Sequence, residues 1–269
     1  MKAEQGTHTT LRLYTWLLIV ALYLPLIVTV AYSFSNTKYI GQWGGFTTRW
    51  YHLLLEDPDL AGALKNSIVI AFGSSTASLA LALPAALAND RLSQRLGEAL
   101  VYPPVIIPEI TEAVALMLLF LYIGFPLGAT SVMIGHIAFN VAYAYVVLRS
   151  SGGEGRRLEL AARTLGAGRL EAKIKVTLPA MAPSIAAAAA ITFLMSFTDF
   201  TKTLFTAGPG FKTLTILLWN RARRPGLNPL TSQPYLAAIT SVMIGVSLAF
   251  LALVLALEKT GDRNKGQEP

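Results

Sequence analysis

Long apolar segments alternate with short polar segments along the whole chain. A helix needs about 20 apolar residues to cross the roughly 30 Å hydrocarbon core of a bilayer. Six segments reach or approach this length, namely residues 14–34, 67–89, 99–123, 129–148, 180–200 and 235–257. The third contains Pro103, Pro104 and Pro108, so we expect it to be broken or kinked. The pattern predicts an all-α membrane protein with about six transmembrane helices in a single domain, residues 1–269.

The composition agrees with this class and argues against others. The chain is 54% hydrophobic and only 14% charged, whereas soluble domains carry about 25% charged residues. Its net charge of +7 could indicate a nucleic-acid partner, but the basic residues lie between apolar segments, so we expect none. The chain has no cysteine and only scattered histidines, of which His136 is interpreted as a hydrogen-bonded packing residue. We therefore expect no metal site and no catalytic residues.

The distribution of basic residues predicts an orientation. Six crossings put both termini on the same side as the Arg- and Lys-rich segment 149–178, and the positive-inside rule makes that side the cytoplasm. The external segment after residue 200 does not follow the rule, because it carries Arg221, Arg223 and Arg224. These arginines could attract an anionic solute, but we favour docking to acidic residues of an extracytoplasmic protein.

The cytoplasmic segment 158–178 has the pattern of two short helices separated by a turn. Helix-forming residues continue to Leu165 and end at Gly166, and Ala161 and Ala162 form a small-sided apolar stripe beside Glu159. The residues alone leave two interpretations open. The first helix either inserts into a groove on a partner protein or lies on the membrane surface as an ordinary amphipathic helix.

This segment closely resembles the cytoplasmic coupling signature of bacterial binding-protein-dependent ABC importer permeases, and we call it the coupling loop. That signature is Glu-Ala-Ala, three residues, Gly, about nine residues, Ile, one residue and Leu-Pro. The residues in register are Ala161, Ala162, Gly166, Val176, Leu178 and Pro179. Leu160 occupies the glutamate position and Glu159 precedes it, a displacement of about 100° around a helix. The resemblance implies an ATPase-coupling surface formed by Glu159, Leu160, Ala161, Ala162, Gly166 and Ala167.

Two further segments resemble the second permease of spermidine/putrescine importers: Gly44–Ala71 and Ser196–Trp219. In those permeases two adjacent acids typically occupy the positions of Thr198 and Asp199. Only Asp199 is acidic here, and Lys202 follows closely. This difference weakens the polyamine assignment but leaves the importer assignment intact.

The resemblance implies an ABC importer type I permease bundle, of the methionine-importer-type fold, in a bacterial inner membrane. It also implies a second permease subunit that pairs with this chain as a heterodimer, two cytoplasmic ATPases and a periplasmic solute-binding protein. The chain would be a non-enzymatic subunit that moves a polyamine-like or other small charged solute by alternating access. It contains no GxxxxGK[ST] motif, so ATP and Mg²⁺ are expected in the partner ATPase and no cofactor in this chain.

Ionisable residues at membrane depth are costly and by default face a cavity, a partner or a solute pathway. Glu109 and Glu112 share one face of the third span, and Asp199 lies at the external end of the fifth between aromatic residues suited to cation–π contact. The predicted pathway residues are Glu109, Glu112, Phe197, Thr198, Asp199 and Phe200. The alternative is that the acids pair with Lys65, Lys202 or a partner subunit and serve packing.

Two other functions compete with the importer. A secondary transporter or channel without an ATPase would be expected to show internal inverted repeats, which the sequence does not display. An intramembrane enzyme would require a nucleophile with a base, or a metal site. The dispersed histidines and the lack of cysteine argue against both kinds of site.

Overall fold

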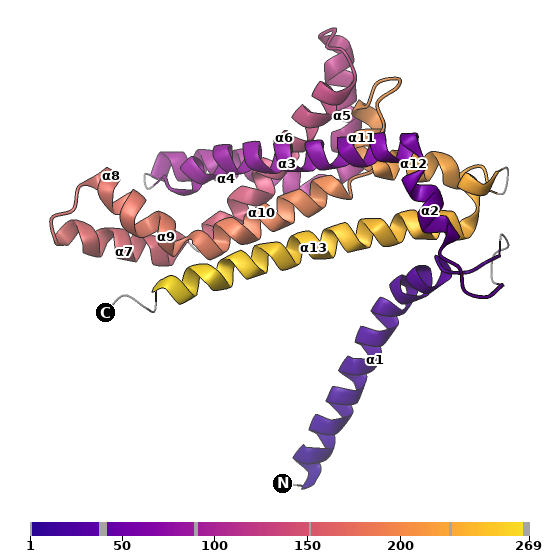
Figure 1. The fold of residues 1–269 in the computed structure, drawn as a ribbon. Coiled ribbons are helices and arrows are strands. Elements are labelled where there is room, and N and C mark those ends of the chain that lie inside the picture. Colours follow the sequence, from indigo (N-terminus) through magenta and orange to yellow (C-terminus); the bar gives the residue numbers. More distant parts are fainter. Residues whose placement is uncertain (1, 38–41, 89–90, 151, 226–227, 266–269) are drawn as a thin grey trace. The chain divides into compact units, whose positions relative to one another are not determined.

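A computed structural model describes residues 2–37, 42–88, 91–150, 152–225 and 228–265 (Figure 1). Every regular element in these residues is a helix, which confirms the predicted all-α class. The chain divides into two compact units. Unit 1 comprises Met1–Pro58 and Leu218–Gly245, and unit 2 comprises Asp59–Leu217 and Val246–Pro269. The single membrane domain stays a prediction, and the two units are described in turn.

The helices of unit 1 are α1 (Lys2–Tyr32), α2 (Arg49–Leu55), the end of α12 (Leu214–Ala222), the 3-10 helix η2 (Pro229–Thr231) and the start of α13 (Gln233–Lys265). Unit 2 contains α3 (Pro58–Ala86), α4 (Arg91–Ile106), α5 (Glu109–Tyr122), α6 (Ala129–Ser150), α7 (Gly152–Thr164), α8 (Arg169–Ala172), the π-helix η1 (Lys173–Thr177), α9 (Leu178–Ala180), α10 (Ala182–Phe197), α11 (Thr201–Thr206) and the remainder of α13.

Four of the described helices are long and apolar enough to cross a membrane. They are Tyr14–Tyr32 within α1, α3, α6 and Gln233–Ala256 within α13. Two bent pairs raise the number to six if each pair is one span: α4 with α5, bent by 110°, and Arg169–Ala180 with α10, bent by 64°. The structure therefore agrees with about six transmembrane helices.

The predicted break in the third span lies at Pro108. This residue precedes α5 with a ψ of 133°, because a proline cannot supply the amide proton that would continue α4. Pro103 and Pro104 instead lie inside the last turns of α4. The break gives α5 its own N-terminus and places Glu109 and Glu112 in the first turn of that helix.

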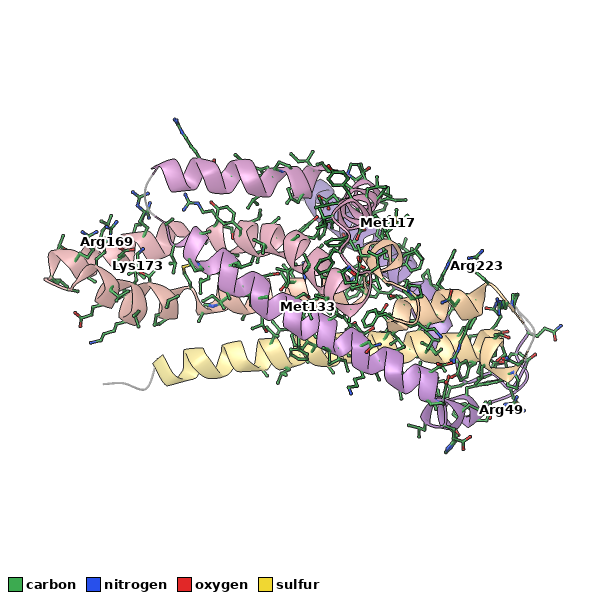
Figure 2. All side chains as sticks on the ribbon, turned by 90° about the horizontal axis from the view of Figure 1, so that it is seen from above. Arg49, Met117, Met133, Arg169, Lys173 and Arg223 are labelled. Atoms are coloured by element: carbon green, nitrogen blue, oxygen red, sulfur yellow. The ribbon has the colours of Figure 1, made fainter. Side chains whose placement is uncertain are left out.

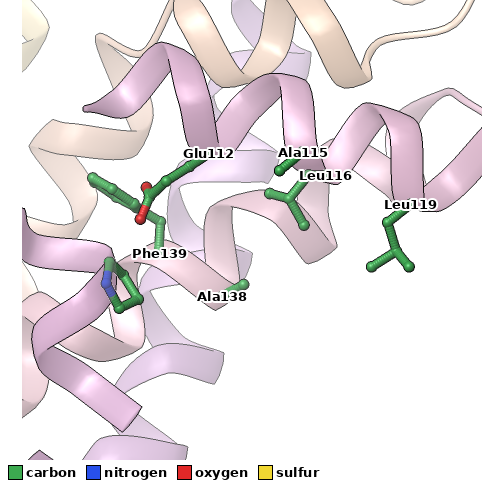
Figure 3. Close-up of a pocket in the computed structure, with 7 residues that line it drawn as sticks. Glu112, Ala115, Leu116, Leu119, Ala138 and Phe139 are labelled. Atoms are coloured by element: carbon green, nitrogen blue, oxygen red, sulfur yellow. The ribbon is translucent and has the colours of Figure 1, made fainter. Parts of the chain in front are cut away.

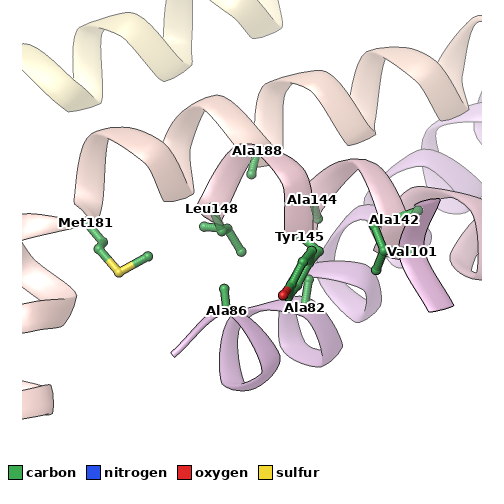
Figure 4. Close-up of a cluster of buried hydrophobic side chains, with 9 residues drawn as sticks. All are labelled: Ala82, Ala86, Val101, Ala142, Ala144, Tyr145, Leu148, Met181 and Ala188. Carbon is green, nitrogen blue, oxygen red and sulfur yellow. The ribbon is translucent and has the colours of Figure 1, made fainter. Parts of the chain in front are cut away.

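Small side chains let the helices of unit 2 approach closely (Figure 4). Its buried cluster is formed by Ala82, Ala86, Val101, Ala142, Ala144, Tyr145, Leu148, Met181 and Ala188. Membrane helices gain little from hydrophobic burial against lipid and associate instead through close van der Waals packing, which alanine permits. The cluster therefore holds α3, α4, α6 and α10 together by shape.

A buried ion pair organises unit 1. The Arg221 guanidinium donates hydrogen bonds to Asp57 Oδ2 at 2.5 Å and to the Tyr235 hydroxyl at 3.1 Å. The Tyr235 hydroxyl donates to the same Asp57 oxygen at 2.5 Å. Burial by itself lowers the pKa of Arg221, but its hydrogen bond with Asp57 and the charge of that carboxylate outweigh burial and raise it above its ordinary value.

This arginine cluster of Asp57, Arg221 and Tyr235 corrects one sequence-based prediction. Arg221 was expected to dock an extracytoplasmic protein, but it is buried and engaged inside unit 1. The physical reason is its neighbour in space, Asp57, which is 164 residues away in sequence. Arg223 and Arg224 are exposed and still suit a docking surface.

Replacing Arg221 with Leu should destabilise the protein strongly, because it leaves the Asp57 carboxylate buried without its cation. Breaking one side of a buried pair costs about 3–5 kcal/mol. The thermal midpoint of the purified protein in detergent measures this loss. Arg223→Leu, at an exposed position, is the matched control and should change stability by no more than about 0.5 kcal/mol. Equal midpoints for the two variants would contradict a structural role for Arg221.

A close backbone contact in unit 2 depends on Gly208, in the segment after α11. A Cβ placed on Gly208 would lie 2.0 Å from the carbonyl oxygen of Leu127, in the turn before α6. Ser131 strengthens the same junction by donating a hydrogen bond to the Thr206 carbonyl at 2.8 Å. The two segments thus meet backbone to backbone, and a side chain does not fit between them.

Gly208→Ala should therefore lower stability by about 1–3 kcal/mol, the usual cost of overpacking. Gly62→Ala is the control, since a Cβ at that position in α3 meets no atom within 4 Å. Fluorescence-detected gel filtration after heating would compare the two variants. A wild-type melting temperature for Gly208→Ala would show that the junction is looser than the structure indicates.

Candidate functional site

A buried polar network joins α6, α10 and α11 in unit 2. His136, on α6, lies with Nδ1 2.6 Å from Ser196 Oγ and with Nε2 3.2 Å from Asp199 Oδ2. Asp199 Oδ2 also accepts hydrogen bonds from the backbone amide and the hydroxyl of Thr203, both at 2.9 Å. His136 is fully buried, as expected of a hydrogen-bonded packing residue, and it orients the carboxylate at the start of α11.

Lys202 occupies the centre of this region. Its ammonium lies 2.5 Å from Glu109 Oε1, 2.8 Å from Asp199 Oδ1 and 3.8 Å from the centre of the Phe139 ring. We call Glu109, Phe139, Asp199 and Lys202 the cation cluster. It connects α5, α6 and α11, and both the lysine and Asp199 are buried. Two of the predicted pathway acids are thus paired with Lys202, which was the alternative to a pathway role.

The aromatic residue of the cluster is not one of those predicted. Phe197 is buried and stacks against Phe193, with ring centres 5.8 Å apart, so it belongs to the core. Thr198 is exposed and donates a hydrogen bond to the Leu194 carbonyl at 2.8 Å, and Phe200 is half-buried. Phe139 was missed, although it follows His136 by three residues and so shares its helix face.

Glu112 differs from Glu109 in its surroundings. It lines a cavity of about 280 Å³, and one of its carboxylate oxygens is buried without a hydrogen-bond partner among the described residues. The other lining residues are Pro104, Ala115, Leu116, Leu119, Ala138 and Phe139. Figure 3 shows the carboxylate at one end of this apolar lining, with Leu116 and Leu119 further along α5. We call this cavity the Glu112 pocket.

Phe139 connects the two features. Its ring lies beneath the Lys202 ammonium and also lines the Glu112 pocket. Glu109 and Glu112 are one helical turn apart on α5, as their spacing predicted. The region therefore combines a filled cation site with a neighbouring apolar pocket that ends in a carboxylate.

The coupling loop forms a rigid corner. Gly166 has a φ of +97°, and its amide donates to the Arg163 carbonyl while the Ala167 amide donates to the Ala162 carbonyl, both at 3.1 Å. These two bonds make a Schellman motif, which ends a helix with a glycine in a left-handed conformation. The glycine of the signature thus terminates α7, as predicted.

Three contacts anchor the loop to the helices below it. α7 packs against α8, η1 and α9, and a Cβ on Gly155 of α7 would lie 3.1 Å from the Thr177 side chain. The Lys173 ammonium donates a hydrogen bond to the Leu87 carbonyl, at the end of α3, at 3.0 Å. Figure 2 shows Lys173 and Arg169 at the same end of unit 2. These contacts fix α7 to the neighbouring helices of unit 2.

The exposed surface of the coupling loop carries two leucines beside the arginines of α7. Leu165 is 90% exposed and Leu160 is 53% exposed, whereas Glu159 is only 3% exposed. Of the other predicted coupling residues, two are exposed, Ala161 and Gly166, and two are half-buried, Ala162 and Ala167. The one-residue displacement of the glutamate thus turns it inward, so Glu159 does not belong to the outward-facing surface that the resemblance implied.

The basic segment of unit 1 retains an exposed part. The Arg223 guanidinium lies 5.6 Å from the centre of the Trp219 ring. Asn220, Arg223 and Arg224 line a depression in the surface. These two arginines, and not Arg221, are available to a partner.

Comparison with known proteins gives a consistent result. Residues 70–260 match the family described as binding-protein-dependent transport system inner membrane component. The chain is 33% identical over 219 residues to the putrescine transport system permease protein PotI of Escherichia coli, covering 77% of this chain and 78% of that protein. It is 28% identical over 246 residues to the spermidine/putrescine permease PotC of the same organism, covering 89% and 90%.

Solved structures share the fold at low sequence identity. A chain of a bacterial alginate ABC transporter, in complex with an alginate pentasaccharide-bound periplasmic protein, superimposes with a TM-score of 0.66 at 17% identity, covering 94% of this chain and 93% of that one. A chain of the MetNI methionine ABC transporter gives a TM-score of 0.55 at 16% identity, covering 81% and 97%. The expected methionine-importer-type permease fold is confirmed.

The family match spans most of the sequence, the relatives are permeases, and the helices are those of a multi-pass membrane protein. The chain belongs to the binding-protein-dependent transport system inner membrane components, the permease subunits of ABC importers.

Proposed function

We propose that this chain is one of two permease subunits of an ATP-driven importer that carries a small charged solute into the bacterial cytoplasm. Its partners are a second, related permease, two cytoplasmic ATPases that bind ATP and Mg²⁺, and a periplasmic solute-binding protein. Both termini and the coupling loop lie in the cytoplasm. The observation that carries this proposal is the rigid, leucine-covered corner of the coupling loop at Gly166.

The coupling loop suits a protein partner better than a membrane surface. An amphipathic helix on a membrane buries a broad apolar face in the lipid headgroup region, whereas α7 ends in a Schellman turn that exposes Leu165 at a corner. A projecting leucine fits a groove on an ATPase. Movement of the ATPases would then displace α7, and its contacts with η1 and α9 would pass that movement to α10.

The solute pathway is proposed to pass the Glu112 pocket. One oxygen of its carboxylate is buried at the end of an apolar cavity, an arrangement that attracts a positively charged group carried on an apolar body. Among the relatives, two permeases are named for putrescine or for spermidine and putrescine, which supports an amine-containing solute. Alternating access would open this region first to the binding protein and then to the cytoplasm.

The periplasmic protein is proposed to dock partly on Arg223 and Arg224. Both are exposed beside a surface depression in unit 1. Complementary charge across such a surface speeds encounter and selects the partner. This docking would also account for basic residues on the external side of the membrane, where the positive-inside rule does not expect them.

Replacing Gly166 with Val should uncouple ATP hydrolysis from import. A β-branched residue is strongly disfavoured at a φ of +97°, so α7 would lose its fixed end, at a cost on the order of 1–2 kcal/mol. The measurement is solute imported per ATP hydrolysed by the reconstituted complex, and a several-fold fall is expected. The control, Gly168→Val, adds a side chain at a φ of −63° into open space. An unchanged ratio for Gly166→Val would remove the loop from coupling.

Replacing Glu112 with Gln should weaken recognition of a cationic solute. Loss of a charge-assisted contact is worth about 1.5 kcal/mol or more, so KM for uptake should rise roughly tenfold while the maximal rate changes less. The solute would first be identified by a thermal-shift screen of the cognate binding protein. Glu56→Gln is the control, because that carboxylate is exposed and lies outside both the pocket and the coupling loop. An unaltered KM would place Glu112 outside the pathway.

A further inference from the structure

We propose that Lys202 is the resident occupant of a binding site for a primary ammonium group and that it closes this site to the solute. The inference rests on the proposed function, because it concerns the selectivity of the same pathway. Its consequence is that the permease favours solutes with one cationic group over solutes with several. Lys202 is thus assigned as a specificity-determining residue.

The surroundings of the Lys202 ammonium are those of a complete cation site. Carboxylate oxygens of Glu109 and Asp199 lie 2.5 and 2.8 Å from Nζ, and the Phe139 ring lies 3.8 Å away. A primary ammonium has three N–H donors. Two carboxylates and one aromatic face match that number, and the aromatic face contributes through its negative quadrupole.

The Asp199 side of the site is held in place and buried, while the Glu109 side chain is 48% exposed. Asp199 is oriented by His136 and by the two donors of Thr203, and its backbone carbonyl accepts a hydrogen bond from Thr215 at 2.7 Å. The lysine side chain is about 3% exposed. Such a site keeps its geometry whether the ammonium belongs to the chain or to a ligand, because the groups that build it are held from α5, α6 and α11.

The position of Lys202 in the sequence holds its ammonium beside Asp199. The helix α11 is only six residues long, and Lys202 stands three residues after Asp199, so the two side chains meet. A second cation brought to this cluster would meet the fixed charge of Lys202 at close range and be repelled. The ammonium of a solute is therefore directed to Glu112, which lines the neighbouring pocket together with Phe139.

Lys202→Ala tests the inference by vacating the site. Butylammonium, which reproduces the lysine stem and its charge, should stabilise the purified variant against heating more than it stabilises the wild type, in a saturable manner. The uncharged 1-butanol should not. The added stabilisation should disappear in Lys202→Ala/Glu109→Gln, which lacks one of the two carboxylates.

Lys175→Ala is the matched control, since it removes an exposed lysine that is also paired with a glutamate. It should respond to butylammonium as the wild type does. Equal responses of Lys202→Ala and the wild type, or equal responses to butylammonium and 1-butanol, would overturn the proposal. If Lys202→Ala does not fold alone, its yield with each additive becomes the readout. Recovery with butylammonium only supports the site, and recovery with both or neither overturns it.

A second measurement addresses selectivity directly. In the wild type, 1,4-diaminobutane should bind no more tightly than butylamine, whereas in Lys202→Ala its relative affinity should rise by roughly tenfold, the effect of one additional good contact. An unchanged ratio would refute the specificity role. These binding measurements use the isolated permease, so their result does not depend on whether the coupling loop binds an ATPase. A negative result would refute the role of Lys202 and would not affect the outcome expected for Gly166→Val.

Discussion

A charge inside a membrane protein must be compensated by the protein itself, because the bilayer core offers no water. In unit 2 this requirement is met by Lys202, which brings its ammonium within 2.8 Å of two carboxylates and over an aromatic ring. The contacts of this ammonium connect α11 with the consecutive helices α5 and α6, which lie far from it in sequence. The break at Pro108 is what allows Glu109 to reach it, since a straight third span would not begin a new helix there. The polar network of unit 2 therefore answers this one constraint, and the break at Pro108 and the short helix α11 position the groups that take part in it.

The cation cluster also determines which acidic residue a cationic solute could contact. Glu109 and Asp199 are both ion-paired with Lys202. Glu112, in contrast, forms no ion pair among the described residues, and one of its carboxylate oxygens is buried without a hydrogen bond there. It lies in an apolar cavity, where a carboxylate interacts more strongly with a cation than it would in water. The cation cluster and the Glu112 pocket share Phe139, so a shift of this side chain would alter both. This arrangement links the proposed selectivity to groups that also stabilise the fold.

The coupling loop uses a different principle, rigidity of the backbone. A Schellman motif fixes the end of α7, and Lys173 ties the loop to the end of α3. Inward rotation of Glu159 leaves Leu160 and Leu165 to form the outer surface. The family signature is thus kept in its glycine and small residues, which set the shape, while the exposed contact is apolar instead of acidic.

Local sequence patterns were enough to predict the helical class, the approximate number of membrane spans and the break near Pro108. They also predicted the helix stop at Gly166. These features depend on local properties: the length of apolar segments, the missing amide proton of proline and the conformational freedom of glycine. The shared face of Glu109 and Glu112 follows from helix periodicity in the same way.

Only the tertiary structure decided which charged residues meet. Arg221 pairs with Asp57 across 164 residues, Lys202 with Glu109 across 93, and the aromatic partner of Lys202 is Phe139 and not Phe197 or Phe200. It also decided that Glu159 turns inward and that Glu112, not Asp199, opens into a pocket. Such pairings depend on how helices pack against one another, and a side chain's local sequence carries no record of its partner on another helix.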